Sequence, residues 1–198
     1  MRTEITLVQL YYSELKDLFR NYLDDYYTLK LVKNNKDKLT YFQGAKRVDI
    51  TDHLLSDNMT SLMKLINRGL ANRKTRDNAT NDVSSRSILL LNVYVTWEYY
   101  NSDGSLWRSE KKKFTIVDLA GQERAARLDI NDKRYREALF INESLDCLMG
   151  TTRKVSVGKT PDFTIHPVML SISDTFGGNW QKNSAQIFVC MSPSNFDK

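Results

Sequence analysis

The sequence predicts an α/β fold in which a mixed central sheet carries helices on both faces. Apolar runs of strand length at residues 5–12, 87–100 and 185–191 alternate with stretches of helical spacing, which is typical of α/β proteins. In addition, Asn101-Ser102-Asp103-Gly104 separates two long strand-like runs. Asp-Gly adopts positive φ readily, so this turn predicts a hairpin and therefore an antiparallel component of the sheet.

The first half of the chain supplies a strand, small hairpin strands and one long helix. After the strand at 5–12, the spacing of Leu15, Leu18 and Phe19 predicts a short helix over 13–19. Short strands are expected at 29–32, 39–42 and 47–50. A helix over 58–70, capped by Ser56 or Asp57, has an apolar face that we expect to lie in the core, formed by Met59, Leu62, Met63, Ile66 and Leu70.

The second half supplies the long hairpin, two helices and a last strand. Residues 87–100 and 106–119 are the hairpin strands, and the run Lys111-Lys112-Lys113 is expected at a solvated edge, available to an acidic partner. A helix over 135–148 is expected to end at Gly150. His166-Pro167 opens another helix, with proline near its first position. Residues 185–191 read as a buried strand.

Composition allows one domain with a real core and excludes several other classes of protein. The 198 residues carry a net charge of +5, which favours an acidic partner without choosing nucleic acid or protein. Cys147 and Cys190 read as small buried residues, and with His53 and His166 as the only histidines a His/Cys metal cage is not expected. No signal-peptide pattern and no membrane-spanning apolar run is visible, so a cytoplasmic protein is expected.

A candidate phosphate and magnesium site follows the second hairpin strand. Asp118 stands at the carboxyl end of that strand, where α/β sheets bind ligands, and Gly121 follows three residues later. The carboxylate suits a water of Mg²⁺, and the glycine lets a backbone N–H approach a phosphate. The spacing alone fits an ordinary Asp/Gly turn equally well.

A second segment supports the functional interpretation. Asn81, Ser84, Ser85 and Arg86 form the pattern N-x-x-S-S-R-S directly before the strand at 87–100. Together with V-D-L-A-G-x-E around Asp118, this pattern resembles the two nucleotide-sensing switch segments of the kinesin motor domain. The resemblance covers most of the chain, including residues 7–19, 72–73, 141–145, 174–179 and 190–194.

The resemblance implies a three-layer α/β/α motor fold, and the chain reads as one partial domain over residues 1–198. Ser84 and Ser85 would face the γ-phosphate and Mg²⁺, Asp118 would hold a metal-bound water, and Gly121 would sense the γ-phosphate. Arg86 and Glu123 would form the ion pair that closes the site. Mg-ATP or Mg-ADP is the family's cofactor and tubulin its partner, and the candidates for microtubule contact are Lys111, Lys112, Lys113, Asn142, Ser144 and Leu145.

The phosphate-binding P-loop, G-x-x-x-x-G-K-[ST], is missing from these 198 residues. Gly158-Lys159-Thr160 reads as a chance match, because Arg153 stands where the first glycine belongs. The chain therefore resembles the later part of a motor domain, either a piece of a longer protein or a truncated relative. On its own it is expected to bind ATP weakly or not at all and to have no meaningful ATPase activity. Basic residues that the family carries before its penultimate helix are also absent from residues 163–167.

Three functional hypotheses follow from the sequence. The first is part of an ATP-driven, cytoskeletal microtubule motor, and the second is a non-catalytic kinesin-like module that binds microtubules or another protein. The third is a small GTPase, suggested by D-L-A-G-Q-E, but no P-loop and no N-K-x-D guanine motif accompany it. A nucleic-acid binder would rest on net charge alone, and no membrane association is expected.

Overall fold

The computed structural model describes residues 1–12, 14–20, 29–74, 86–121 and 133–176. Four strands of the central sheet lie in the order β2-β1-β6-β7. The edge of β1 that faces away from β6 pairs with β2 near its C-terminal end and with β5 near its N-terminal end. The strands of this sheet are β1 (Arg2–Tyr11), β2 (Glu14–Asp17), β5 (Val48–Asp49), β6 (Ile88–Tyr100) and β7 (Leu106–Asp118). Pairings between the described strands are antiparallel throughout.

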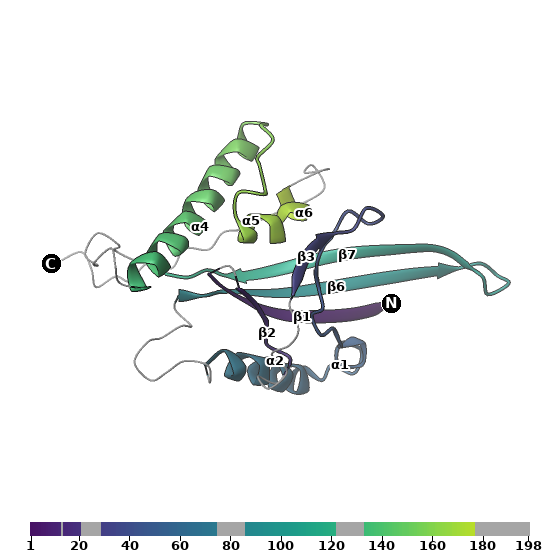
Figure 1. The fold of residues 1–198 in the computed structure, drawn as a ribbon. Coiled ribbons are helices and arrows are strands. Elements are labelled where there is room, and N and C mark those ends of the chain that lie inside the picture. The colour runs from purple at the N-terminus through teal and green to yellow at the C-terminus, as the bar shows by residue number, and fades with distance from the viewer. Residues whose placement is uncertain (13, 21–28, 75–85, 122–132, 177–198) are drawn as a thin grey trace, which may run out of the picture.

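Helices cover both faces of this sheet (Figure 1). α4 (Lys133–Ser156), α5 (Pro167–Ser171) and α6 (Ser173–Phe176) lie on one face, with the hairpin of β3 (Lys30–Lys33) and β4 (Thr40–Gln43) beside them. α1 (Thr51–Leu55) and α2 (Met59–Lys74) lie on the other face. The three-layer α/β fold predicted from the sequence is confirmed.

Alternation along β1 builds both layers of the core. Val8 and Leu10 pack toward α4 and α5, whereas Ile5 packs toward α2 with Leu62. Because side chains alternate across a strand, a strand covered on both faces is apolar at nearly every position. β1 has buried side chains on both faces, β6 has buried side chains on one face and half-buried side chains on the other, and both strands were predicted correctly.

Three local predictions were wrong. Residues 13–19 do not begin a helix: Tyr12 takes φ 56°, the chain turns, and Glu14–Asp17 returns along β1 as β2. Gly150 does not end α4, which continues to Ser156 and stops where Gly158, at φ 72°, donates its N–H to Val155 O. Asn58, rather than Ser56 or Asp57, caps α2 by accepting from Ser61 N.

The apolar face of α2 is rotated from the predicted one. Met59 and Met63 are about half exposed, at 49% and 48%, so the prediction that they lie in the core was wrong. The buried stripe instead contains Leu62 and Gly69. A Cβ on Gly69 would lie 2.6 Å from Leu7 Cδ2, so the glycine allows α2 to approach the sheet closely.

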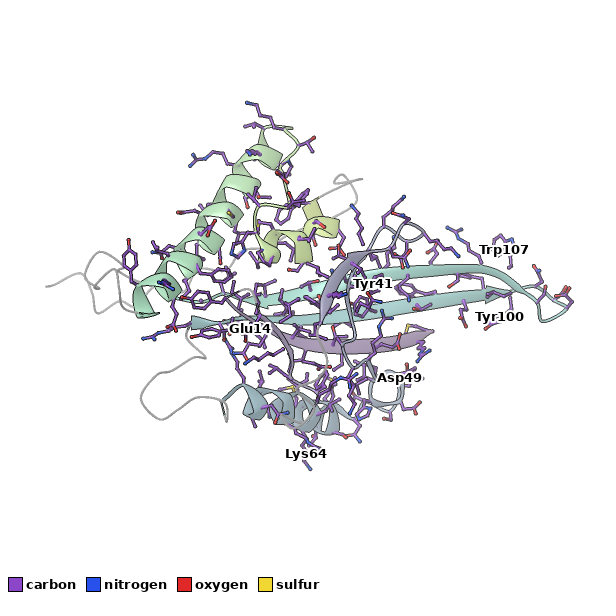
Figure 2. All side chains as sticks on the ribbon, in the orientation of Figure 1. Glu14, Tyr41, Asp49, Lys64, Tyr100 and Trp107 are labelled. Carbon is purple, nitrogen blue, oxygen red and sulfur yellow. The ribbon has the colours of Figure 1, made fainter. Side chains whose placement is uncertain are left out.

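The β6–β7 hairpin extends beyond the rest of the sheet (Figure 1). The last residue of β6 that pairs with β1 is Thr96, opposite Arg2, while β6 and β7 stay paired as far as Tyr100 and Leu106. Exposed Tyr100 and Trp107 mark this outer part (Figure 2). The Asp-Gly turn forms as predicted, with Gly104 at φ 81°.

Candidate functional site

Arg73, in the last turn of α2, joins the start of β6 to the end of β7. Its guanidinium donates through Nη1 to Asp118 Oδ2 at 2.9 Å and through Nη2 to the carbonyl oxygen of Ser87 at 2.8 Å. Its Nε lies 3.3 Å from Ser87 Oγ. The arginine is 8% exposed, so one planar, permanently charged group fixes two segments from inside the protein.

Ser87 is the anchor on the β6 side. It is fully buried, and its hydroxyl also accepts a hydrogen bond from Gln9 Nε2 at 2.9 Å. Buried polar groups are costly unless they are hydrogen-bonded, and here the partners come from β1 and α2. The position immediately after Arg86 is therefore tied to the centre of the sheet.

Asp118 stays accessible to solvent while it is held. Its side chain is 61% exposed although one oxygen is bound by Arg73. Among the described residues no group of three or more metal-ligating side chains occurs. Magnesium usually takes one or two protein carboxylates and keeps several waters, so Asp118 fits the part of one water-holding ligand. Ser85, the other predicted ligand, lies outside the described residues.

Arg86 pairs with α4 in this structure. Its Nη1 lies 3.0 Å from Glu137 Oε2, and both side chains are largely buried. Tyr11 donates to the other oxygen of the same carboxylate. Burial, followed by the hydrogen bond to Glu137, raises the pKa of Tyr11 well above its usual range. Glu137 thus links the beginning of β6, the end of β1 and α4.

The remaining predicted residues are only partly described. Asn81, Ser84, Ser85 and Glu123 lie outside the described residues, so the Arg86–Glu123 ion pair stays a prediction. Gly121 is exposed, and a Cβ there would meet no described atom within 4 Å. Among the predicted switch residues that the structure describes, Asp118 is linked to the first segment. Arg73 joins it to Ser87, the residue that follows Arg86.

Comparison with known proteins decides the family. The model of the kinesin motor domain matches residues 1–196. This chain belongs to the kinesin motor domain family. A rice (Oryza sativa subsp. japonica) kinesin-like protein KIN-1 is 27% identical over 193 residues, which cover 96% of this chain and 37% of that protein. The Xenopus laevis kinesin-like protein KIF11-B is 27% identical over 98% of this chain and 17% of its own length.

Solved structures confirm the fold. A structure described as kinesin 6 superposes with a TM-score of 0.68 at 19% identity, over 90% of this chain and 48% of that one. The motor domain of kinesin-like Kar3 from Saccharomyces cerevisiae gives 0.63 at 22% identity, over 90% and 50%. The chain thus spans half or less of each of these kinesins. No helix in the described part of the chain has the length and apolarity to cross a membrane.

The lysine run is less solvated than predicted for this kinesin-like chain. Lys112 is exposed, whereas the side chain of Lys113 is buried, with its ammonium 2.7 Å from Asp174 Oδ2. The Lys113 ammonium also donates to the carbonyls of Thr40 and Ser171. Lys111 is half-buried, with its ammonium 5.7 Å from the ring centre of Tyr41. The prediction that Lys113 contacts a microtubule is contradicted by this burial, because its charge is satisfied inside the protein.

The α4 candidates divide in the same way. Ser144 is 1% exposed, donates to Phe140 O and lies 3.1 Å from His166 Nε2, so it too offers no contact surface. Leu145 is partly buried against the core. Asn142 is half-buried on the open side of the helix. Lys111, Lys112, Asn142 and the exposed part of Leu145 therefore remain the surface candidates.

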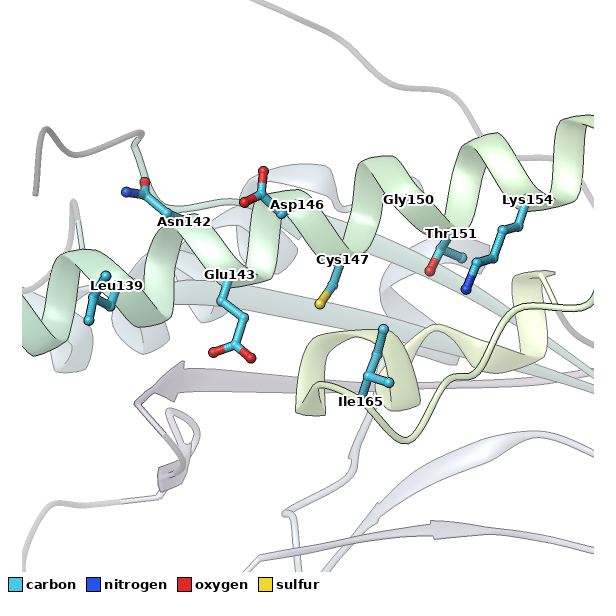
Figure 3. A pocket seen from close by; sticks show the side chains of 9 residues that line it. All are labelled: Leu139, Asn142, Glu143, Asp146, Cys147, Gly150, Thr151, Lys154 and Ile165. Carbon is cyan, nitrogen blue, oxygen red and sulfur yellow. The ribbon is translucent and has the colours of Figure 1, made fainter.

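A cavity of about 590 Å³ runs along the open side of α4 (Figure 3). Its lining combines apolar side chains with the charged residues Glu143, Asp146 and Lys154, and Ile165 contributes from the segment before α5. Gly150 contributes no side chain there, so the glycine that fails to end the helix widens the cavity instead. Cys147 faces this space, and burial raises the pKa of its thiol, which keeps it protonated.

Sequence reasoning missed the residues that organise the site. Arg73 entered only as half of an Asn-Arg pair that resembles the family, and Gln9 and Glu137 were not singled out. A cation at the end of an amphipathic helix is usually solvated, and only the three-dimensional contact with Ser87 distinguishes Arg73. Glu137 offered a weak signal, as an acid on the buried face of α4.

Proposed function

We propose that this chain contributes the switch-bearing part of an ATP-driven motor that moves on microtubules, and that residues 1–198 alone do not hydrolyse ATP. The supporting observation is the Arg73 contact, which joins Ser87, directly after the S-S-R sequence, to Asp118, the first residue of D-L-A-G. The end of the first segment that resembles a kinesin switch and the start of the second are thus held by one side chain.

Each residue of the site then has a defined task. Asp118 would hold a water of Mg²⁺, and Ser84 and Ser85 would be the residues that contact the phosphate and the metal. When bound, the metal neutralises charge on the phosphates. Arg73 orients the Asp118 carboxylate toward the end of β7. Arg86, which is paired with Glu137 in this structure, would pair with Glu123 in the closed site that the family resemblance implies.

The missing P-loop explains why the chain alone should be inactive. Backbone amides and the lysine of a P-loop supply most contacts to the β- and γ-phosphates. Two switch segments leave the β-phosphate without a cradle. We therefore propose that a P-loop segment, from a longer chain or a partner, completes the site, with tubulin as the partner and the cytoskeleton as the location.

Isothermal titration calorimetry with Mg-ATP tests this proposal. Residues 1–198 should show no magnesium-dependent binding, and Asp118→Ala should behave like the unchanged chain. Adding the kinesin segment that carries the P-loop should create magnesium-dependent ATP binding that Asp118→Ala weakens. Micromolar, magnesium-dependent binding by residues 1–198 alone would contradict the proposal, as would a completed domain that binds ATP without regard to Asp118.

A non-catalytic microtubule-binding module is the second candidate. Residues 163–167 lack the basic residues of the family, and Arg73 and Arg86 are both paired within the protein. Microtubule co-sedimentation of the completed domain separates the two functions. The motor predicts pelleting that differs between ATP and ADP, whereas the module predicts pelleting that ignores nucleotide.

A further inference from the structure

A second cavity, on the opposite face of the sheet from α4, is lined by cations from three segments of the chain. It has a volume of about 360 Å³. Arg20 follows β2, Lys46 lies between β4 and β5, and Arg68 belongs to α2. None of the described residues that line the cavity is acidic. Positive charges that converge without a lining carboxylate repel one another, and an anion relieves that repulsion.

The nearest carboxylate is already engaged below the cavity. Asp17 has a side-chain exposure of 4% and lies 3.3 Å from Arg20 Nε. Its oxygens also accept from the backbone N–H groups of Phe19, at 2.9 Å, and Lys46, at 2.6 Å. One buried negative charge therefore balances the charge of Arg20 and fixes its position. The positive charges of Lys46 and Arg68 are not balanced by it.

The helix that forms one wall strengthens this imbalance. The segment Met59–Lys74 contains lysines and arginines but no aspartate or glutamate. Arg68 and the side chain of Lys46 are exposed, and no ion pair joins either to an acid among the described residues. Both cations are thus available to a ligand, whereas Arg20 also donates to Gly44 O at 3.1 Å and is held in place.

Apolar side chains complete the lining. Leu18 and Phe19 contribute to one wall, and Val48 and Leu65 are half-buried beside them. A lone oxyanion would leave these surfaces uncovered. A ligand with one doubly charged end and a short organic part would match both halves of the cavity.

We propose that this cavity binds a phosphate monoester, with Arg68 and Lys46 contacting the phosphate oxygens and Arg20 forming the rear of the site. Arginine suits this task because its planar donors match phosphate oxygens in pairs. The ligand is either a phosphorylated side chain of a protein or a free sugar phosphate. This site is separate from the switch residues and needs no metal, so it stands independently of the proposed nucleotide site.

Chemical-shift titration of the ¹⁵N-labelled chain, in magnesium-free buffer, tests the proposal. The probes are a phosphoserine peptide, its unphosphorylated form, glucose 6-phosphate and inorganic phosphate. We expect saturable shifts of Arg20, Lys46 and Arg68 with at least one ester and none with the unphosphorylated peptide. Tighter binding of the peptide identifies a protein source, and tighter binding of the sugar phosphate identifies a metabolite.

Variants localise the binding. Arg68→Gln and Lys46→Gln should each weaken the tighter ester by about tenfold, the loss expected for one charge-assisted contact. Lys64→Gln is the matched control, because Lys64 is an exposed cation on the same helix that lies outside the cavity (Figure 2). It should change affinity less than twofold. Equal losses in all three variants, equal binding of inorganic phosphate, or no saturable shift would each overturn the proposal.

Discussion

Replacing Arg73 with alanine removes three hydrogen bonds to described residues, and these residues differ in their exposure to solvent. Two of them go to Ser87, which has no exposure to solvent, and the third goes to Asp118, whose side chain is 61% exposed. The variant leaves the carbonyl oxygen of Ser87 buried without this charged donor. The Asp118 carboxylate, by contrast, is free to bind water.

These surroundings set the size of the effect. Leaving a buried hydrogen-bonding group without its partner costs about 1–3 kcal/mol, and hydrogen bonds to charged groups lie at the upper end. An ion pair with a largely exposed carboxylate contributes about 0–1 kcal/mol. We therefore expect Arg73→Ala to lower the free energy of unfolding by about 2–4 kcal/mol and Asp118→Ala to lower it by less than about 1 kcal/mol.

Urea denaturation followed by circular dichroism measures both variants. The ratio between the two losses is the informative quantity, because it compares the two ends of one guanidinium in the same protein. If Asp118→Ala proved as destabilising as Arg73→Ala, the argument that Arg73 acts mainly through Ser87 would be refuted. A loss below about 1 kcal/mol for Arg73→Ala would refute it equally.

Three further predictions concern other parts of the structure. Gly69→Ala should destabilise the protein by about 1–3 kcal/mol through overpacking against the sheet. Gly150→Ala adds a Cβ that meets no described atom within 4 Å, so it should stabilise α4 by up to about 1 kcal/mol. Thermal denaturation compares the two variants, and equal effects would contradict the packing argument. Lys113→Ala should lower the free energy of unfolding by about 3–5 kcal/mol, because it leaves the buried Asp174 carboxylate without its cation. Lys112→Ala, at an exposed position, should change it by no more than about 0.5 kcal/mol. Similar losses for the two variants in urea denaturation would contradict the role of the buried ion pair. Burial lowers the pKa of His166, whose Nδ1 accepts the cap hydrogen bond of α5. The unfolded state therefore binds the proton more tightly, and the free energy of unfolding should fall as the pH drops below about 6.5. Comparison with His166→Asn isolates this contribution, and a contribution that grows as the pH is lowered from 7.5 to 5.5 would contradict the prediction.

The sequence predicted elements well where local chemistry decides the structure. The Asp-Gly turn specifies the β6–β7 hairpin, and His166-Pro167 specifies the start of α5, because each acts through its own backbone. The prediction failed where distant contacts decide. Residues 14–17 become a strand because β1 offers an open edge, and α2 turns Met63 to solvent because Gly69 must face the sheet.

The same division holds for the site. Asp118 and Arg86 could be recognised, because each belongs to a motif that directly adjoins an apolar strand of the sequence. Arg73 and Glu137 could not, because their importance comes from burial between elements far apart in the chain. Ser144 and Lys113 show the reverse error: both match a surface motif or charge pattern, but the fold places them inside.

The pairing of β1 with β6 has a consequence for how the protein is made. Leu10 pairs with Ile88, so a central strand must wait for its principal neighbour until a long intervening stretch has left the ribosome. Of the described strands that are made before β6, the short β2 and β5 are the ones that pair with β1. Strand pairing between distant segments is slow, and uncovered apolar strands invite aggregation. Synthesis of this domain should therefore depend on chaperones that hold β1 until β6 arrives.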